Sequence, residues 1–206
     1  MPDSPAATVF LPDFAGYPIC YFGIRALLPA ELPAIYCDYT RRWPYASVPE
    51  LARMICGDLP CGDIGAVIGY SFGAHVAIEV AASLVRAGQV PRLVLVDPPA
   101  LADVAALATR DVSAILRTHP DYAYLSDLVE CELASFECMA GNIAALARVA
   151  VPVALPCPAT ILLAGDRPAP PELRDAVAVY HLPGCDHRSI LAHPATLPQI
   201  VAAMTR

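Results

Sequence analysis

The chain is poor in charged and aromatic residues, and it lacks the basic clusters typical of nucleic-acid-binding proteins. Of its 206 residues, 57% are hydrophobic, 16% are charged and only 7% are aromatic, a balance that suits a packed globule and not a disordered tail. The formal net charge is −7, and no run of basic residues is longer than Arg41-Arg42. Because nucleic acid is bound through basic surfaces, we expect no nucleic-acid partner.

Long apolar runs and secretion signals are also missing. No stretch approaches the roughly 20 apolar residues that a membrane-spanning helix needs. The start, Met1-Pro2-Asp3-Ser4-Pro5, does not have the basic and then apolar layout of a signal peptide. We therefore expect a cytoplasmic protein with no membrane partner.

The eight cysteines form no recognisable framework. They are scattered between Cys20 and Cys185, and no pair has CxxC spacing. A chain of this size does not need disulfides for stability, so we expect reduced, mostly buried thiols and no metal site.

Strand-like and helix-like patterns alternate along the chain, which fits a single domain over residues 1–206. The expected strands are 8–11, 34–38, 64–68, 92–97, 159–164 and 176–182, and the expected helices are 21–28, 47–56, 74–87, 170–175 and 194–204. Because parallel strands are usually connected through a helix that crosses the sheet, this order predicts an α/β fold with a mostly parallel central sheet flanked by helices.

One segment, between Pro99 and Pro152, carries helical patterns and no strand pattern. The expected helical pieces are 101–107, 112–116, 125–133 and 143–149. The segment therefore reads as a helical insertion between two strands of the sheet.

The pentapeptide Gly69-Tyr70-Ser71-Phe72-Gly73 lies between a predicted buried strand and a predicted helix. In that setting, small residues around the serine allow a strained turn that presents its hydroxyl above the sheet. A serine hydroxyl is a weak nucleophile near neutral pH, so it needs a general base and an acid that orients the base. The motif thus predicts a serine hydrolase with Ser71 as the nucleophile.

Asp97 and His187 are the candidate acid and base. Asp97 ends the strand after the nucleophile helix, and His187 lies in the loop after the last predicted strand, so both should reach the edge of the sheet where Ser71 lies. Asp166, which follows a later strand, is an alternative acid. The other histidines lack the loop position that a base requires; they are His75, His119, His181 and His193.

An acyl-transfer mechanism also needs donors for the oxyanion that develops when Ser71 attacks a carbonyl. Two backbone N–H groups are placed for this role: that of Phe72, directly after the nucleophile, and that of Phe14, in the loop after the first strand.

Over nearly its whole length the chain resembles the thioesterases of nonribosomal peptide and polyketide synthesis, which belong to the α/β-hydrolase superfamily. The segments that carry the resemblance are 10–17, 69–79, 93–97 and 183–187, and the first has Asp13 where a second proline is frequent in the family. In that family the acid commonly follows the strand after the nucleophile helix, which favours Asp97 over Asp166.

The resemblance implies a substrate held as a thioester on the phosphopantetheine arm of an acyl or peptidyl carrier protein, and no other cofactor. It implies release by hydrolysis or macrocyclisation, and a helical lid at about residues 100–152. Tyr122, Tyr124 and Met139 would either line an acyl channel in this lid or pack into the core. Two other readings stay open: a small-molecule carboxylesterase or lipase, and a catalytically inactive hydrolase fold that serves as a binding module.

Overall fold

A computed structural model describes residues 6–111, 114–115, 118–150 and 154–205. Its centre is a six-stranded sheet of order β2-β1-β3-β4-β5-β6, and every neighbouring pair of strands is parallel. The strands are β1 (Ala7–Leu11), β2 (Ala34–Tyr36), β3 (Ile64–Tyr70), β4 (Arg92–Val96), β5 (Ala159–Ala164) and β6 (Ala178–Leu182). The sheet confirms the predicted α/β fold, and all its carboxyl ends meet at one edge.

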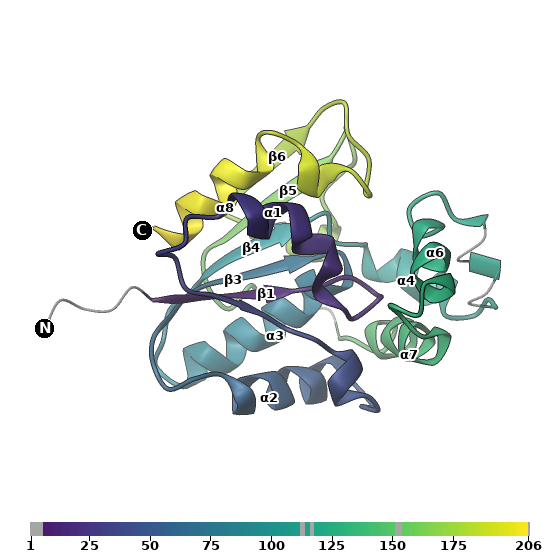
Figure 1. Ribbon diagram of the computed structural model, residues 1–206, viewed down its shortest axis with the longest axis horizontal. Helices are drawn as coiled ribbons and strands as arrows, with labels where there is room; N and C mark the ends of the chain where they lie inside the picture. The colour runs from purple at the N-terminus through teal and green to yellow at the C-terminus, as the bar shows by residue number, and fades with distance from the viewer. Residues whose placement is uncertain (1–5, 112–113, 116–117, 151–153, 206) are drawn as a thin grey trace, which may run out of the picture.

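Helices cover both faces of the sheet (Figure 1). The helices of the described residues are α1 (Phe22–Leu27), α2 (Val48–Asp58), α3 (Phe72–Arg86), α4 (Leu101–Leu107), α6 (Tyr124–Glu130), α7 (Phe136–Leu146) and α8 (Thr196–Met204), with the short 3-10 helices η1 (Pro18–Tyr21), η2 (Thr40–Arg42), η3 (Pro171–Leu173) and η4 (Ile190–Ala192). Among these helices, none combines the length and the apolar character that crossing a bilayer requires.

The core has two layers because alternate residues of a strand point to opposite faces. Val67 and Leu95 pack in the layer that α2 and α3 cover, whereas Ile68 and Val94 pack in the layer that α1 and α8 cover. Both faces are therefore buried, as is usual for a parallel sheet, and this explains the continuous apolar runs of β3 and β4.

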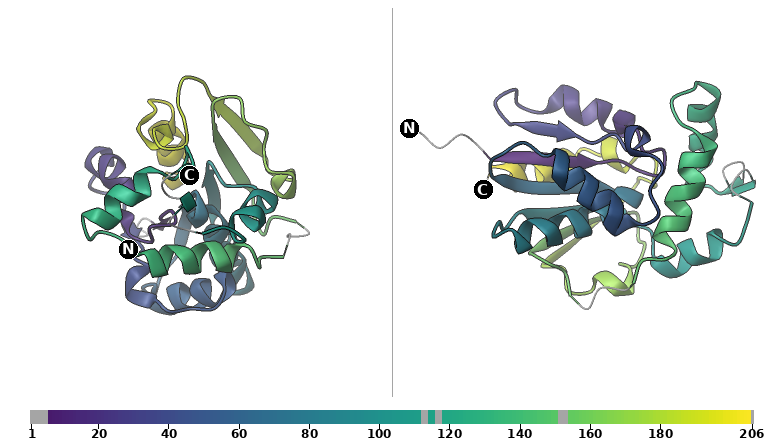
Figure 2. Two further views of the ribbon diagram at one scale, coloured as in Figure 1. Left: turned by 90° about the vertical axis from the view of Figure 1, so that its right-hand side faces the viewer. Right: turned by 90° about the horizontal axis from the view of Figure 1, so that it is seen from below.

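The helices α4, α6 and α7 lie together beyond the carboxyl ends of the strands, as Figures 1 and 2 show. We refer to the described residues of this region, 101–111, 114–115 and 118–146, as the α4–α7 segment. The expected piece 101–107 is α4, and 125–133 corresponds to α6. The expected piece 112–116 lies partly outside the described residues.

Two expected helices are wrong in extent. The piece expected at 143–149 belongs to α7, which begins at Phe136 because the hydroxyl of Ser135 accepts a hydrogen bond from the Cys138 N–H (3.1 Å) and caps the helix. The helix expected at 170–175 is only the 3-10 turn η3. Prolines at 168, 170 and 171 disfavour helical backbone in the residues before them.

The turn from β3 to α3 is packed against the loop that follows β1. A Cβ atom on Gly73 would lie 2.1 Å from the carbonyl oxygen of Leu11 and 2.4 Å from that of Pro12. A Cβ atom on Gly69 would lie 2.2 Å from the carbonyl oxygen of Gly73. Both glycines are therefore required where strand, helix and loop approach one another.

This close approach predicts that Gly73→Ala destabilises the protein by about 3 kcal/mol or more, because two backbone oxygens would have to move. Gly57→Ala is the matched control: Gly57 is in α2 with nothing within 4 Å of an added Cβ, so alanine should be neutral or stabilise by up to about 1 kcal/mol. Urea unfolding of both variants measures the difference. Equal stabilities would contradict the proposed clash.

Candidate active site

Ser71 occupies the turn between the end of β3 and the start of α3. Its φ of 55° and ψ of −122° place it in a region that residues other than glycine rarely adopt. The Ser71 N–H donates to the Val96 carbonyl (2.9 Å), which ties the turn to β4. The sequence places the hydroxyl at the edge where the strands end, as the motif predicts.

Ser71, His187 and Asp97 form a continuous hydrogen-bonded chain although they come from three different connections. His187 Nε2 lies 3.0 Å from Ser71 Oγ, and His187 Nδ1 lies 2.6 Å from Asp97 Oδ2. Because a carboxylate only accepts, Nδ1 carries the proton and Nε2 is free to accept one from the serine. All three side chains are at most 2% exposed.

Asp97, and not Asp166, contacts His187. The other carboxylate oxygen of Asp97, Oδ1, accepts from the Ala164 N–H at the end of β5 (2.9 Å), so the side chain is held from two sides. Asp166 is exposed in the turn after β5. Ser71, His187 and Asp97 therefore have the geometry of a nucleophile, a base and an acid, and Asp166 does not take part in it.

The imidazole of His187 contacts two tyrosines: Tyr70, whose contact with the base the sequence did not predict, and Tyr122, which the sequence offered either as part of an acyl channel or as a core residue. The ring of Tyr70 stacks on it at 5.1 Å between centroids, and the Tyr70 hydroxyl donates to the His187 carbonyl (2.7 Å). Tyr122 meets the same imidazole edge-on at 5.6 Å. Met139, the third residue named with Tyr122 and Tyr124, is fully buried in the core.

The two residues whose backbone N–H groups are the predicted oxyanion donors are in contact through their side chains. The Phe14 and Phe72 rings stack at 5.3 Å, and Phe72 is the first residue of α3, where the helix dipole favours negative charge. In the described part of the chain, neither N–H is paired with a backbone or side-chain acceptor. Both groups are therefore available to an oxyanion.

Asp13 is a buried carboxyl group beside this loop. Its Oδ1 accepts from the Ala15 N–H (3.0 Å) and its Oδ2 from the Tyr124 hydroxyl (2.5 Å). Burial raises the pKa of Asp13 above its usual 3.8, while the two hydrogen bonds and the charge of His187 lower it less. The departure of Asp13 from the family pattern was the only sequence signal for this residue.

Arg167 joins the acid to the α4–α7 segment. Its guanidinium lies 3.5 Å from Asp97 Oδ2 and 2.6 Å from Asp121 Oδ1. A hollow of about 520 Å³ lies here, between this segment and the sheet, and its lining includes Asp97, His119 and Tyr122. This hollow reaches the acid side of the Ser71, His187 and Asp97 chain.

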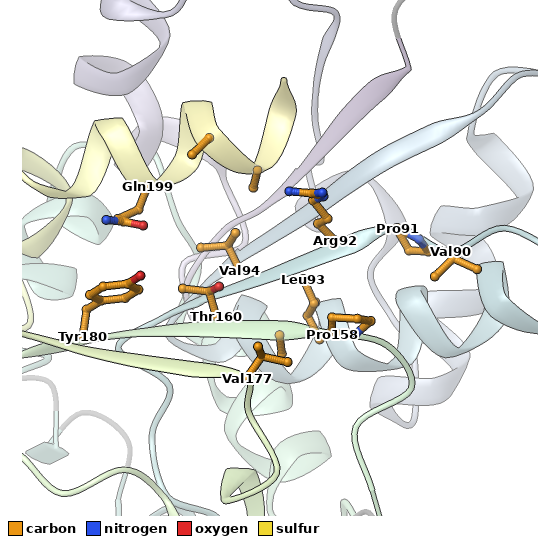
Figure 3. A pocket seen from close by; sticks show the side chains of 13 residues that line it. Val90, Pro91, Arg92, Leu93, Val94, Pro158, Thr160, Val177, Tyr180 and Gln199 are labelled. Atoms are coloured by element: carbon orange, nitrogen blue, oxygen red, sulfur yellow. The ribbon is translucent and has the colours of Figure 1, made fainter. Parts of the chain in front are cut away.

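A second pocket, of about 440 Å³, lies at the opposite edge of the sheet (Figure 3). Val90, Pro158 and Val177 precede the amino ends of β4, β5 and β6, and Gln199 of α8 closes the pocket from above. Ligands of parallel sheets bind at the carboxyl ends of strands, so this pocket is unrelated to the candidate site. The described residues contain no cluster of His, Cys, Asp and Glu that could hold a metal.

A family described as the alpha/beta hydrolase family matches residues 3–199. No curated protein matches the chain by sequence. Among solved structures, the NocB thioesterase domain of the nocardicin cluster has a TM-score of 0.69 and 25% identity, covering 99% of this chain and 96% of that one.

The same NocB domain in covalent complex with a fluorophosphonate nocardicin G analog has a TM-score of 0.71 at 24% identity, over 98% of this chain and 96% of that one. The RedJ thioesterase of the prodiginine pathway of Streptomyces coelicolor has a TM-score of 0.72 at 23% identity, over 97% and 86%. The likeness to biosynthetic thioesterases expected from the sequence is thus confirmed for the fold.

The buried Asp13 predicts a pH-dependent stability difference. Its pKa in the folded protein is raised above the unfolded value near 3.8, so the unfolded chain ionises first and stability is lost as the pH rises through the folded pKa. The groups around Asp13 are Tyr124 of α6, His187, Cys20, Tyr21 of η1 and Tyr70 of β3.

We expect Asp13→Asn to be more stable than the unchanged chain at pH 7 and to lose this advantage towards pH 4. Between the two pKa values, one proton changes the difference by about 1.4 kcal/mol per pH unit. Urea unfolding across this range measures it. A difference that does not vary with pH would show that Asp13 is ionised in the folded state just as in the unfolded one.

Proposed function

The chain belongs to the alpha/beta hydrolase family, and we propose that within it the protein acts as a thioesterase of polyketide or nonribosomal peptide biosynthesis. It would release an acyl or peptidyl chain from the phosphopantetheine thioester of a carrier protein. The observation that carries the proposal is the buried chain from Ser71 Oγ through His187 to Asp97, with distances of 3.0 and 2.6 Å.

In the first half of the reaction, Ser71 Oγ attacks the thioester carbonyl and His187 Nε2 takes the hydroxyl proton. Asp97 holds the tautomer of His187 and stabilises the imidazolium. The carbonyl oxygen becomes an oxyanion that the N–H groups of Phe14 and Phe72 bind. The carbon–sulfur bond then breaks, His187 returns the proton to the leaving thiol, and the acyl group stays on Ser71.

In the second half, His187 removes a proton from the incoming nucleophile, which attacks the acyl-Ser71 ester. Water gives hydrolysis, and a hydroxyl or amine of the acyl chain itself gives a macrocycle. His187 then protonates Ser71 Oγ as it leaves. No bound group other than the phosphopantetheine of the substrate takes part.

Support for a thioester substrate comes from the comparisons and from the cover over the site. The NocB domain and RedJ are both thioesterases of biosynthetic pathways, and their likeness extends over almost all of this chain. The α4–α7 segment would act as the lid of this site, since Tyr122 contacts His187. Exclusion of water by such a cover strengthens electrostatic stabilisation inside it.

Ser71→Ala is expected to reduce the release of acyl chains from an acylated carrier protein by about 10⁴-fold or more. Ser83→Ala is the matched control, because Ser83 is on the same helix α3 and its hydroxyl donates to the Glu79 carbonyl (3.0 Å) and accepts from Arg86 Nη2 (3.0 Å). The free thiol of the carrier is measured over time. Comparing a thioester with the matched oxygen ester, with and without carrier, separates a thioesterase from a carboxylesterase.

A fluorophosphonate, the reagent class bound to the NocB domain, should label the unchanged chain on Ser71 and leave Ser71→Ala unlabelled. Mass spectrometry identifies the adduct. A chain that takes up no label would support the inactive binding module.

The acid is tested by two matched substitutions. We expect Asp97→Asn to lower kcat by about 10⁴-fold, because it disturbs the His187 tautomer, and Asp166→Asn to leave turnover close to that of the unchanged chain. Carrier-thioester turnover is measured for both variants side by side. Loss of activity in Asp166→Asn alone would assign the acid to Asp166.

A further inference from the structure

The loop that supplies one oxyanion donor is held by side chains of the α4–α7 segment. Asn142, in α7, donates from Nδ2 to the Phe14 carbonyl (2.9 Å) across 128 positions of sequence. Its side chain is fully buried, and its Oδ1 accepts from the Tyr45 hydroxyl. The orientation of the amide is fixed, because the Phe14 carbonyl can only accept.

Asn142 is the one polar side chain on the buried face of α7. The other buried residues of the helix are apolar or sulfur-containing: Cys138, Met139, Ile143, Ala145 and Leu146. A buried amide is costly unless it is hydrogen-bonded. The Phe14 carbonyl and the Tyr45 hydroxyl satisfy it, so the position of α7 and the position of the oxyanion loop depend on each other.

The neighbouring residue keeps α7 close to the body of the protein. A Cβ atom on Gly141 would lie 1.9 Å from the ring of Trp43, and the Trp43 ring packs edge-on against Tyr45 at 5.3 Å. Only glycine allows this approach, which brings the Asn142 amide within reach of Phe14.

Other hydrogen bonds also hold the turn that contains Phe14. The Asp13 carbonyl accepts from the Gly16 N–H (3.0 Å), and the Asp13 carboxyl group accepts from the Ala15 N–H. The same carboxyl group accepts from Tyr124 of α6. Two helices of the α4–α7 segment thus reach one turn, α7 at the Phe14 carbonyl and α6 at Asp13.

We propose that Asn142 and Tyr124 are positioning residues of the reaction, which hold the Phe14 N–H in the oxyanion hole when the α4–α7 segment covers the site. Neither side chain touches the reacting atoms; each acts through the backbone of the loop. This inference rests on the proposed serine-hydrolase mechanism.

The test is the second-order rate constant for phosphonylation of Ser71 by a fluorophosphonate, followed by mass spectrometry of the whole chain. The adduct places an oxygen in the oxyanion hole, and the reaction needs neither a carrier protein nor a thioester. We expect Asn142→Leu to lower this rate constant by about 10- to 100-fold. This decrease is no larger than the one caused by removing an oxyanion donor itself. If part of a variant is unfolded, the final extent of labelling falls, but the rate constant of the folded fraction does not change.

Tyr45→Phe is the matched control, because it removes the other hydrogen bond of Asn142 and leaves the bond to Phe14 in place. Its rate constant should stay within about threefold of the unchanged chain. Tyr124→Phe is a second variant, which removes the hydroxyl that donates to Asp13. It still tests the proposal if Asn142→Leu does not fold. It should also lower the rate constant, with kcat for a thioester falling in parallel and KM nearly unchanged.

Rate constants for Tyr124→Phe and folded Asn142→Leu that equal that of the unchanged chain would overturn the positioning role. Equal losses in Asn142→Leu and Tyr45→Phe would also overturn it, because they would report a general loss of packing. Failure of the unchanged chain to react at Ser71 is a separate result, which would overturn the proposed function and this inference with it.

Discussion

The contact between the β3–α3 turn and the loop after β1 is the constraint on which the whole site depends. Gly69 and Gly73 let backbone atoms approach where any side chain would collide, and Ser71 takes its strained conformation between them. The same contact sets the Phe72 N–H beside the loop of Phe14. Ser71 and the two proposed oxyanion donors therefore depend on one packing contact, while His187 and Asp97 come separately from the ends of β6 and β4.

The sequence was sufficient to predict the site residues that lie after the carboxyl ends of strands. Ser71 and Asp97 come directly after a strand, and His187 lies in the loop that follows the last strand. In a parallel sheet those ends meet at one edge, so the proximity of the three residues could be predicted without any knowledge of packing. The structure brings the same three side chains together. The choice between Asp97 and Asp166 needed the family pattern, since both aspartates follow strands.

The residues that sequence reasoning missed make contacts that no periodicity encodes. Asn142 reaches Phe14 only because α7 begins at Phe136, seven residues before the predicted start, and lies against Trp43. Asp13 meets Tyr124 across 111 positions. Likewise, the connection from β5 to β6 contains a 3-10 turn where a helix was predicted, and Val177 and Tyr180 are left 75% and 42% exposed. Such features depend on how separate segments pack.

Burial of all three triad side chains has a consequence for how the site must work. Ser71, His187 and Asp97 are at most 2% exposed, so the proposed substrate on its long arm would need the α4–α7 segment to move before it reaches Ser71. The polar contacts that hold the segment include Tyr124 with Asp13, Asp121 with Arg167, and Asn142 with Phe14. Two of them end on the loop after β1, and the third ends on the arginine beside Asp97. Under the proposed function, movement of the segment would break its hydrogen bonds to Asp13 and Phe14, so the fit of the acyl chain beneath the segment would govern how fast Ser71 is acylated.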